Sequence, residues 1–388
     1  MIARRQLPVA SPITPEGLRR ACRAAVFPPQ QAWRSVADTL RRRFDSRAIA
    51  LTDSGTSALV LALRLTAGQG GTIAYPAYAC PDLAAAARYA GVQVRLYDID
   101  PLTLSPDMES VRRILHDGVN AIVVVHLFGF PADVPTVRTL AAQSGIPVIE
   151  DAAQGAGATL RGTRAGALGD LSVLSFGRGK GTTAGNGGAL LALNERWHPA
   201  VEAAQLAMPS PERGMSTLTG ALASWALGRP EVYGLPASIP ALHLGETTYH
   251  DAHEPASLSH AGVALLETTL ASMDRHVELR RYHASVLSAA THRSWRGRPS
   301  VPIRGGEPGY LRLPFLAKAD MAPAPQLGIV RSYPRPLSDE PAMYPLLLET
   351  HESLAGAREL ASRLLTLPVH HMVTPRDLGL IGAWLRLP

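Results

Sequence analysis

The chain has 388 residues, 46% hydrophobic and 18% charged, so it is long enough for two or three domains and too apolar to be disordered. Two cysteines without metal-ligand spacing exclude a disulfide scaffold, and we predict no metal site. No apolar run is long enough for a membrane span, the N-terminus does not look like a signal peptide, and the net charge of +6 comes from scattered arginines. We therefore expect a cytoplasmic protein with neither a membrane nor a nucleic-acid partner.

The first half of the chain alternates short apolar strands with helices. After a helical region over 1–45, the predicted strands are 48–52, 72–75, 92–97, 121–126, 146–150, 171–175 and 189–193. The predicted helices between them are 58–66, 82–90, 108–115 and 134–144. This alternation predicts an α/β domain with a mainly parallel sheet.

The pattern changes near residue 205. An apolar stretch rich in proline and alanine follows without a clear period, and then a long helical pattern covers 258–288. The rest of the chain mixes short strands and Pro-rich turns with an amphipathic helix at 354–364. We predict a large domain over 1–205, a connection over 206–240 and a smaller domain over 241–388.

Lysine is rare in this sequence. Of the 38 basic side chains, only Lys180 and Lys318 are lysine. A lysine that has not been replaced by arginine indicates a position that arginine cannot serve, because an amine can lose its proton and form a Schiff base whereas a guanidinium cannot. Lys180 lies in the glycine-rich segment 176–188, whereas Lys318 has no evident reactive partner beside it. Lys180 is therefore the candidate nucleophile.

Two polar turns follow predicted strands. The first, Ser54-Gly55-Thr56-Ser57, begins a helix, where it would either hold a phosphate or simply cap the helix. The second contains Asp151 and Gln154 at a strand end, where α/β sheets place ligand groups, although an acid there also suits a helix cap. A phosphate turn, an acid and a downstream lysine together suit pyridoxal 5'-phosphate, which needs all three.

Residues 54–193 resemble the DegT/DnrJ/StrS family of sugar aminotransferases, which are fold-type-I pyridoxal-phosphate enzymes. The matching segments are SGTSAL, VVHLFGFPADV, VIEDAAQGAGA, GALGDLSVLSF and the Gly-Gly pair after Lys180. Weaker similarity returns at Arg331-Ser-Tyr-Pro and at 365–370. The resemblance implies an α/β fold whose large domain has a seven-stranded, mainly parallel sheet flanked by helices, with a smaller C-terminal α+β domain.

The resemblance also implies roles for individual residues. Lys180 would form the Schiff base and move protons, Asp151 would pair with the pyridine nitrogen, and Gln154 would lie on the hydroxyl side of the ring. The residues expected around the phosphate are Gly55, Thr56, Ser57 and Ser175. The implied reaction moves an amino group from an amino acid, probably L-glutamate, to a keto-sugar that is commonly nucleotide-linked. A homodimer with shared active sites is expected.

Three departures from the family pattern bear on these expectations. Asn186 stands where the family usually has glutamate. Cys80 occupies the position of the aromatic residue that stacks on the ring, so either Cys80 or Tyr78 contacts the cofactor, unless both merely pack in the loop. The family's Asn-Tyr-Arg segment is not recognisable. Residues 242–250 take its place, which makes Tyr249 and His250 candidates for substrate or interface contacts.

The histidines and the alternatives complete the expectations. His126 ends an apolar strand and is predicted to be a packed, hydrogen-bonded structural residue, whereas His370 would either line the pocket or cap a turn.

Two other functions stay open. One is a dehydration or deoxygenation on a sugar-like substrate, although enzymes resembling that branch have histidine in place of the lysine. The other is a binding or regulatory homologue without turnover.

Overall fold

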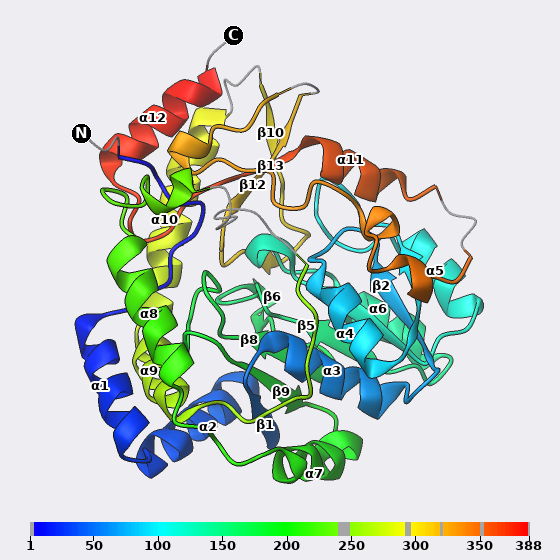
Figure 1. Ribbon diagram of the computed structural model, residues 1–388. Coiled ribbons are helices and arrows are strands. Elements are labelled where there is room, and N and C mark those ends of the chain that lie inside the picture. The colour runs from blue at the N-terminus through cyan, green and yellow to red at the C-terminus, as the bar shows by residue number, and fades with distance from the viewer. Residues whose placement is uncertain (1–3, 240–248, 292–295, 319–320, 350–352, 387–388) are drawn as a thin grey trace.

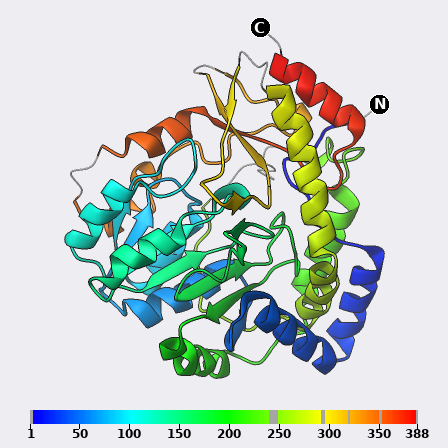
Figure 2. The same ribbon diagram turned by 180° about the vertical axis from the view of Figure 1, so that it is seen from behind.

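A seven-stranded sheet forms the centre of the molecule (Figures 1 and 2). The computed structural model describes residues 4–239, 249–291, 296–318, 321–349 and 353–386. The strand order is β1 (Ala48–Thr52), β9 (Gly188–Ala192), β8 (Leu171–Ser175), β5 (Val148–Asp151), β4 (Ala121–Val125), β2 (Thr72–Pro76) and β3 (Gln93–Tyr97). Strand β9 runs antiparallel to β1 and β8, and the pairs from β8 to β3 are parallel. The predicted mainly parallel sheet is therefore confirmed.

The strands are short apolar runs because both faces of this sheet are covered by helices. Strand β4 illustrates the alternation: Ala121, Val123 and Val125 belong to one hydrophobic cluster, and Ile122 and Val124 belong to another. Helices α3 (Gly55–Thr66) and α4 (Asp82–Ala90) cover the first face, and α5 (Met108–His116) and α6 (Val134–Ala142) cover the second (Figures 1 and 2). This arrangement leaves the carboxyl ends of the parallel strands open for a site.

The long predicted helix at 258–288 is wrong as a single element. The chain forms α9 (His260–Ala271) and α10 (Met273–Thr291), with Ser272 outside helical geometry between them. Helix α9 packs on α1 (Pro15–Val26) and α2 (Gln30–Phe44), which together make the helical N-terminal region. Helix α7 (His198–Ala207) packs on β1.

Three helices were not predicted. Helix α7 follows the last predicted strand, α8 (Met215–Leu227) lies in the stretch that shows no clear period, and α12 (Pro375–Arg386) ends the described chain. Helix α11 (Ala355–Arg363) matches the amphipathic pattern at 354–364 closely. No helix in the described ranges is both long and apolar enough to span a membrane.

The C-terminal part has its own sheet, in the order β10 (Gly297–Pro299), β12 (Leu313–Ala317) and β13 (Leu364–Leu367). Helices α10 and α12 pack on it through residues such as Leu287, Phe315 and Ile381. A third, very short sheet joins β11 (Gly306–Glu307), β6 (Thr159–Leu160) and β7 (Thr163–Arg164). The domain boundary at 240/241 stays a prediction. Helix α9, on its C-terminal side, shares a hydrophobic cluster with β8 and β9.

Candidate active site

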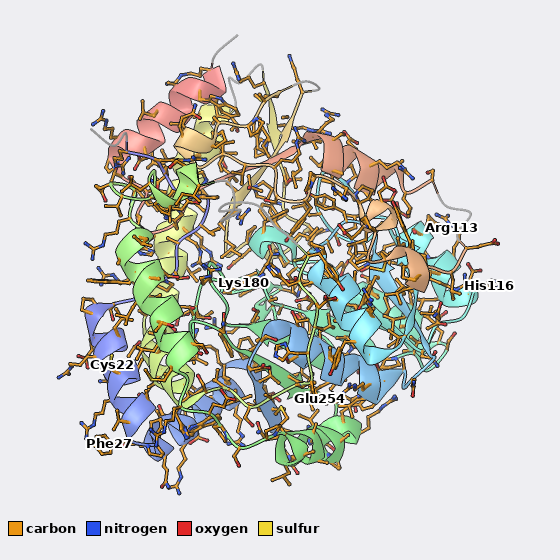
Figure 3. All side chains as sticks on the ribbon, viewed as in Figure 1. Cys22, Phe27, Arg113, His116, Lys180 and Glu254 are labelled. Atoms are coloured by element: carbon orange, nitrogen blue, oxygen red, sulfur yellow. The ribbon has the colours of Figure 1, made fainter. Side chains whose placement is uncertain are left out.

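A cavity of about 210 Å³ opens where β4, β5 and β8 end. Eight of the residues predicted for the site line it, namely Gly55, Thr56, Cys80, Asp151, Gln154, Ser175, Lys180 and Asn186. Figure 3 shows Lys180 inside the molecule, between the helices that include α8 and α10 and the side of the large sheet. Chain segments that are far apart in the sequence therefore meet in one cavity.

The N-terminus of α3 forms one wall. Ser54 caps the helix by accepting the Ser57 N–H at 3.0 Å. The backbone N–H groups of Gly55 and Thr56 make no hydrogen bond within the described chain. Both readings of this turn are compatible, since the side chain caps the helix while two N–H groups and the helix dipole remain available to an anion. The Ser57 hydroxyl lies 2.8 Å from that of Ser54.

Ser57 was expected among the cofactor contacts, and this stays a prediction, but its side chain lies away from the cavity. Only 2% of Ser57 is exposed and it does not line the cavity, because its hydroxyl turns toward Ser54 inside the helix cap. Gly55, by contrast, must be glycine, since a Cβ there would lie 2.7 Å from the Cβ of Ser175. The close approach brings the Ser175 hydroxyl to the end of α3.

Asp151 is the last residue of β5 and is 6% exposed. One carboxylate oxygen accepts the Ala153 N–H at 2.9 Å, and the residue forms no ion pair within the described chain. Burial raises the pKa of this carboxyl, although the Ala153 N–H and the charge of Lys180 act in the opposite direction. A buried acid of this kind favours a cationic partner in the cavity.

Lys180 is half-buried and makes no hydrogen bond or ion pair with any described residue. Its charge acts against the burial that raises the pKa of Asp151 and of Cys80, so its ammonium lies within electrostatic reach of both groups. The glycines on either side have positive φ angles, +72° for Gly179 and +83° for Gly181. The lysine is thus presented on a tight, glycine-flanked turn at the cavity.

The structure separates Cys80 from Tyr78. Cys80 lines the cavity, whereas Tyr78 is fully buried outside it, with its ring in an edge contact 5.4 Å from that of Tyr333. The structure therefore favours Cys80 over Tyr78 as the residue beside the cofactor, because the Tyr78 ring packs against Tyr333 outside the cavity, and the choice between them stays a prediction. Burial raises the pKa of the Cys80 thiol well above its usual value, so the thiol is neutral.

Gln154 is held on both sides of its amide. The side-chain oxygen accepts the Phe128 N–H at 3.0 Å, and the nitrogen donates to the Tyr333 hydroxyl at 2.6 Å. Phe128 in turn stacks on Tyr333 with ring centres 5.6 Å apart. Tyr333 was not predicted as a site residue, although it lies in the Arg331-Ser-Tyr-Pro segment. It fixes the side chain that faces the cavity.

The structural role predicted for His126 is confirmed. Its Nδ1 accepts the Ala132 N–H at 2.9 Å, so the ring proton lies on Nε2, which donates to Glu150 at 2.7 Å. Glu150 also accepts three backbone N–H groups, from Gly166, Leu168 and Gly169, at 2.6 to 3.0 Å. This buried network joins the ends of β4 and β5 behind Asp151.

Three predicted residues do not reach the cavity. Tyr249 donates to Asp251 at 2.9 Å, His250 is exposed, and most of the segment 242–250 lies outside the described residues. His370 donates from Nε2 to the Leu7 carbonyl at 2.9 Å and accepts the Met372 N–H on Nδ1 at 3.3 Å. His370 therefore caps the turn at Met372, and a role in the site stays a prediction. Burial lowers its pKa to about 4.

Two charged lining residues were missed. Asp82 is the first residue of α4, and Arg178 is an exposed residue two positions before Lys180. Arg178 has no hydrogen bond or ion pair with the described residues. Their positions in the sequence could have indicated them, because Asp82 follows the predicted strand 72–75 and Arg178 lies in the glycine-rich segment 176–188. Within the described ranges, no group of three or more His, Cys, Asp or Glu side chains is arranged to hold a metal ion.

Comparison with known proteins agrees with this geometry. Residues 36–212 match the model of the DegT/DnrJ/EryC1/StrS aminotransferase family. An L-glutamine:2-deoxy-scyllo-inosose aminotransferase from Streptoalloteichus tenebrarius is 38% identical over 141 residues, which are 36% of this chain and 33% of that protein. A UDP-N-acetyl-3-dehydro-alpha-D-glucosamine 3-aminotransferase from Acidithiobacillus ferrooxidans is 36% identical over 140 residues, 36% of this chain and 38% of its own.

The region of this chain that matches these two relatives therefore covers about a third of the length of each. The likeness of the whole fold extends further. A sugar aminotransferase from Micromonospora echinospora superposes with a TM-score of 0.74 over 100% of this chain and 99% of that one, at 22% identity. At that identity the likeness establishes the fold, and the fold class expected from the sequence is confirmed.

Proposed function

We propose, from the membership of residues 36–212 in the DegT/DnrJ/EryC1/StrS aminotransferase family, that this protein is a pyridoxal-phosphate-dependent aminotransferase. The observation that carries the proposal is the meeting of Lys180, Asp151 and the free N–H groups of α3 in one cavity. A phosphate site, a buried acid and an amine are the three groups that this cofactor requires.

The residues present fit the cofactor. Its phosphate would be held by the backbone N–H groups of Gly55 and Thr56 and by the Ser175 hydroxyl. Asp151 would pair with the ring nitrogen, and Cys80 would pack against a ring face with its neutral, polarisable sulfur. When bound, pyridoxal phosphate supplies a ring that withdraws electrons from the substrate carbon bearing the amino group.

Each of the central side chains then has a defined task. The Lys180 amine would hold the cofactor and would accept and return the proton of the reacting carbon. The Asp151 carboxylate would keep a proton on the ring nitrogen, which would remove the cost of burying the acid alone. Gln154, fixed by Phe128 and Tyr333, orients the opposite side of the ring.

The substrates follow from chemistry and from the relatives. The amino donor is an amino acid, L-glutamate or L-glutamine, whose carboxylate would meet the unpaired guanidinium of Arg178. The acceptor is the keto group of a sugar or of a sugar-like ring. The cavity of about 210 Å³ is smaller than the roughly 300–1,000 Å³ typical of ligand pockets, so the cofactor would fill it and the acceptor would bind at its mouth.

We include a homodimer in this proposal. Large apolar side chains are exposed on α8, where Met215 is 58%, Leu222 40% and Leu227 49% exposed, and in the segment after it, where Leu235 is 52% and Ile239 50% exposed. Several large exposed apolar side chains in one region of the chain favour burial against a second copy. Contributions of Tyr249 and His250 to the neighbouring site remain part of the proposal.

The test is a two-stage assay on the purified protein with added pyridoxal phosphate. First, a visible absorbance band should form and should bleach when L-glutamate or L-glutamine is added, with release of the matching keto acid. Second, nitrogen-15 from the donor should appear in an acceptor. The acceptor panel contains a UDP-linked 3-keto-sugar, a dTDP-linked 4-keto-sugar and 2-deoxy-scyllo-inosose.

The controls separate the alternatives. Lys180→Arg should abolish band and transfer, whereas Lys318→Arg should preserve both, since it changes the other lysine of the chain. A band without bleaching by any donor would favour a homologue without turnover. Loss of a hydroxyl from the keto-sugar, in place of nitrogen transfer, would favour the dehydratase alternative and reject the aminotransferase.

A further inference from the structure

The backbone around Lys180 has very few hydrogen bonds of its own. Within the described chain, residues 178–182 make one, in which the Gly179 N–H donates to the Ser11 hydroxyl at 2.8 Å. The positive φ angles of Gly179 and Gly181 belong to residues whose conformation is intrinsically the least restricted. Beyond this range, Thr183 is held by Thr269, which accepts the Thr183 N–H at 3.2 Å and donates to the Thr183 carbonyl at 2.8 Å. On the other side of Lys180, the bond to Ser11, a residue near the N-terminus, holds the backbone at Gly179.

The N-terminal segment also packs directly on this turn. A Cβ added to Gly179 would lie 2.6 Å from Val9 Cγ2, so the glycine is required by space as well as by its φ angle. Val9, Ala10 and Pro12 line a small cavity of about 10 Å³ together with Gly181. Residues 6–12, which we name the N-terminal arm, thus contact Gly179 on one side of Lys180 and share a small cavity with Gly181 on the other.

The other end of the arm is fixed to the C-terminal part of the molecule. Gln6 is 2% exposed, and its side-chain nitrogen donates to Asp377 at 2.9 Å and to the Met372 carbonyl at 3.2 Å. The Leu7 carbonyl accepts the bond from His370 at 2.9 Å. Figure 1 shows the arm in dark blue, running from beside α12 past α10 toward α1.

We propose that the N-terminal arm positions the nucleophile, and that Ser11 is a positioning residue for Lys180. The inference rests on the proposed function, in which the lysine must hold the cofactor and return a proton to one carbon. Small displacements of a reacting amine cost rate even when the cofactor still binds. Through Gln6 and His370, the arm also links the placement of Lys180 to the loop before α12.

The test compares Ser11→Ala with Ser11→Thr, which keeps the hydroxyl, and with Ser285→Ala as a matched control. Ser285 lies on the exposed face of α10, and its hydroxyl donates to the Tyr282 carbonyl at 2.8 Å. The first readout is amide hydrogen exchange in the protein without cofactor. We expect faster exchange in a peptide covering 177–182 for Ser11→Ala, and wild-type exchange for Ser11→Thr and Ser285→Ala.

The second readout uses the cofactor-loaded protein and measures its visible absorbance band and the kinetics of amino transfer from the donor. We expect Ser11→Ala to shift the pH midpoint of the visible band and to lower kcat of donor-half transfer about 10-fold, the loss of a hydrogen bond worth ~1.4 kcal/mol. The KM for the donor should change much less, because the arm does not contact the donor. Ser11→Thr should restore both midpoint and kcat.

The outcomes are separable. Unchanged amide exchange at 177–182 in Ser11→Ala rejects the role of the arm, whether or not the protein is an aminotransferase. If amide exchange changes but the pH midpoint of the visible band and kcat do not, the proposal that Ser11 positions Lys180 is rejected. A wild-type protein without a visible band rejects the proposed function instead. If Ser11→Ala does not fold, Val9→Ala removes the packing on Gly179 while leaving the hydrogen bond, and must show the same exchange effect in smaller measure.

Discussion

Asp151 is buried and has no ion-pair partner among the residues that the structure describes, so replacing one carboxylate oxygen should have a large effect on the site. Asp151→Asn keeps the shape and the bond to Ala153 possible, but it removes the charge that would hold a proton on the ring nitrogen. We expect the cofactor to remain bound through its phosphate, while donor-half transfer falls by at least about 100-fold, equivalent to ~3 kcal/mol of lost electrostatic stabilisation.

Stopped-flow measurement of that half-reaction checks the prediction. Asp117→Asn is the matched control, because Asp117 lies just after α5, away from the cavity, with 54% of its side chain exposed. Equal rates for wild type and Asp151→Asn would mean that another group holds the ring.

The two cysteines differ in their expected reactivity. Cys22 is exposed, whereas burial, reinforced by the nearby carboxylate of Asp82, raises the pKa of Cys80. Since the thiolate is the reactive form, iodoacetamide at pH 8 should modify Cys22 and leave Cys80 largely intact. Labelling of Cys80 should increase only when the pH approaches the raised pKa of its thiol. Bound cofactor should reduce the labelling of Cys80 at every pH. Peptide mass spectrometry measures both. Labelling of Cys80 at the rate of Cys22 at pH 8 would contradict a neutral thiol with a raised pKa.

At the scale of elements, the end of α3 depends on the absence of one side chain. Gly55→Ala would place a Cβ 2.7 Å from Ser175 Cβ and 2.9 Å from its hydroxyl, so the serine must move. We expect affinity for pyridoxal phosphate to fall about 10-fold or more and the protein to be destabilised. Overpacking of this kind costs roughly 1–3 kcal/mol.

Gly220→Ala in α8 is the matched control, because nothing lies within 4 Å of the added Cβ. There the higher helix propensity of alanine should raise the free energy of unfolding by about 0.5–1 kcal/mol. Urea unfolding and cofactor titration measure the two effects. A Gly55→Ala protein that binds cofactor as tightly as wild type would show that α3 does not approach the phosphate.

The elements differ in how much of them can be predicted from the sequence. The strands that line the cavity were predicted to within two residues, because strands buried on both faces are uninterrupted apolar runs. Helix α8 was missed because it is apolar all round while only Thr217, Leu218 and Ala221 are buried, so its composition does not mark its inner face. The antiparallel direction of β9 was also not predictable from a local pattern.

The same distinction applies to the site. Lys180, Asp151 and Gln154 meet because parallel strands bring their carboxyl ends to one edge, which the sequence already indicates. Ser57, Tyr78 and His370 do not reach the cavity. The Ser57 hydroxyl turns to Ser54, a local contact of the predicted helix cap. Tyr78 and His370 turn to Tyr333 and Leu7, which are distant in the sequence, so nothing local could predict their positions.

At the scale of the whole molecule, the exposed apolar surface of α8 predicts association. We expect a dimer by light scattering at micromolar concentration, and we expect Leu222→Glu to shift it toward monomer. Leu380→Glu on α12, where the leucine is 46% exposed, is the control that should leave the dimer intact. A monomeric wild type, or equal effects of both substitutions, would contradict this interface.

The central claim is that Lys180 is the residue that carries the cofactor, and the scarcity of lysine makes it directly testable. The protein loaded with pyridoxal phosphate is reduced with borohydride, which makes the lysine–cofactor bond permanent, and is then digested and mapped by mass spectrometry. Only Lys180 and Lys318 compete for the label among the side-chain amines of the chain. The account predicts a stoichiometric adduct on the Lys180 peptide and none on Lys318. An adduct on Lys318, or no adduct on either lysine, would contradict it.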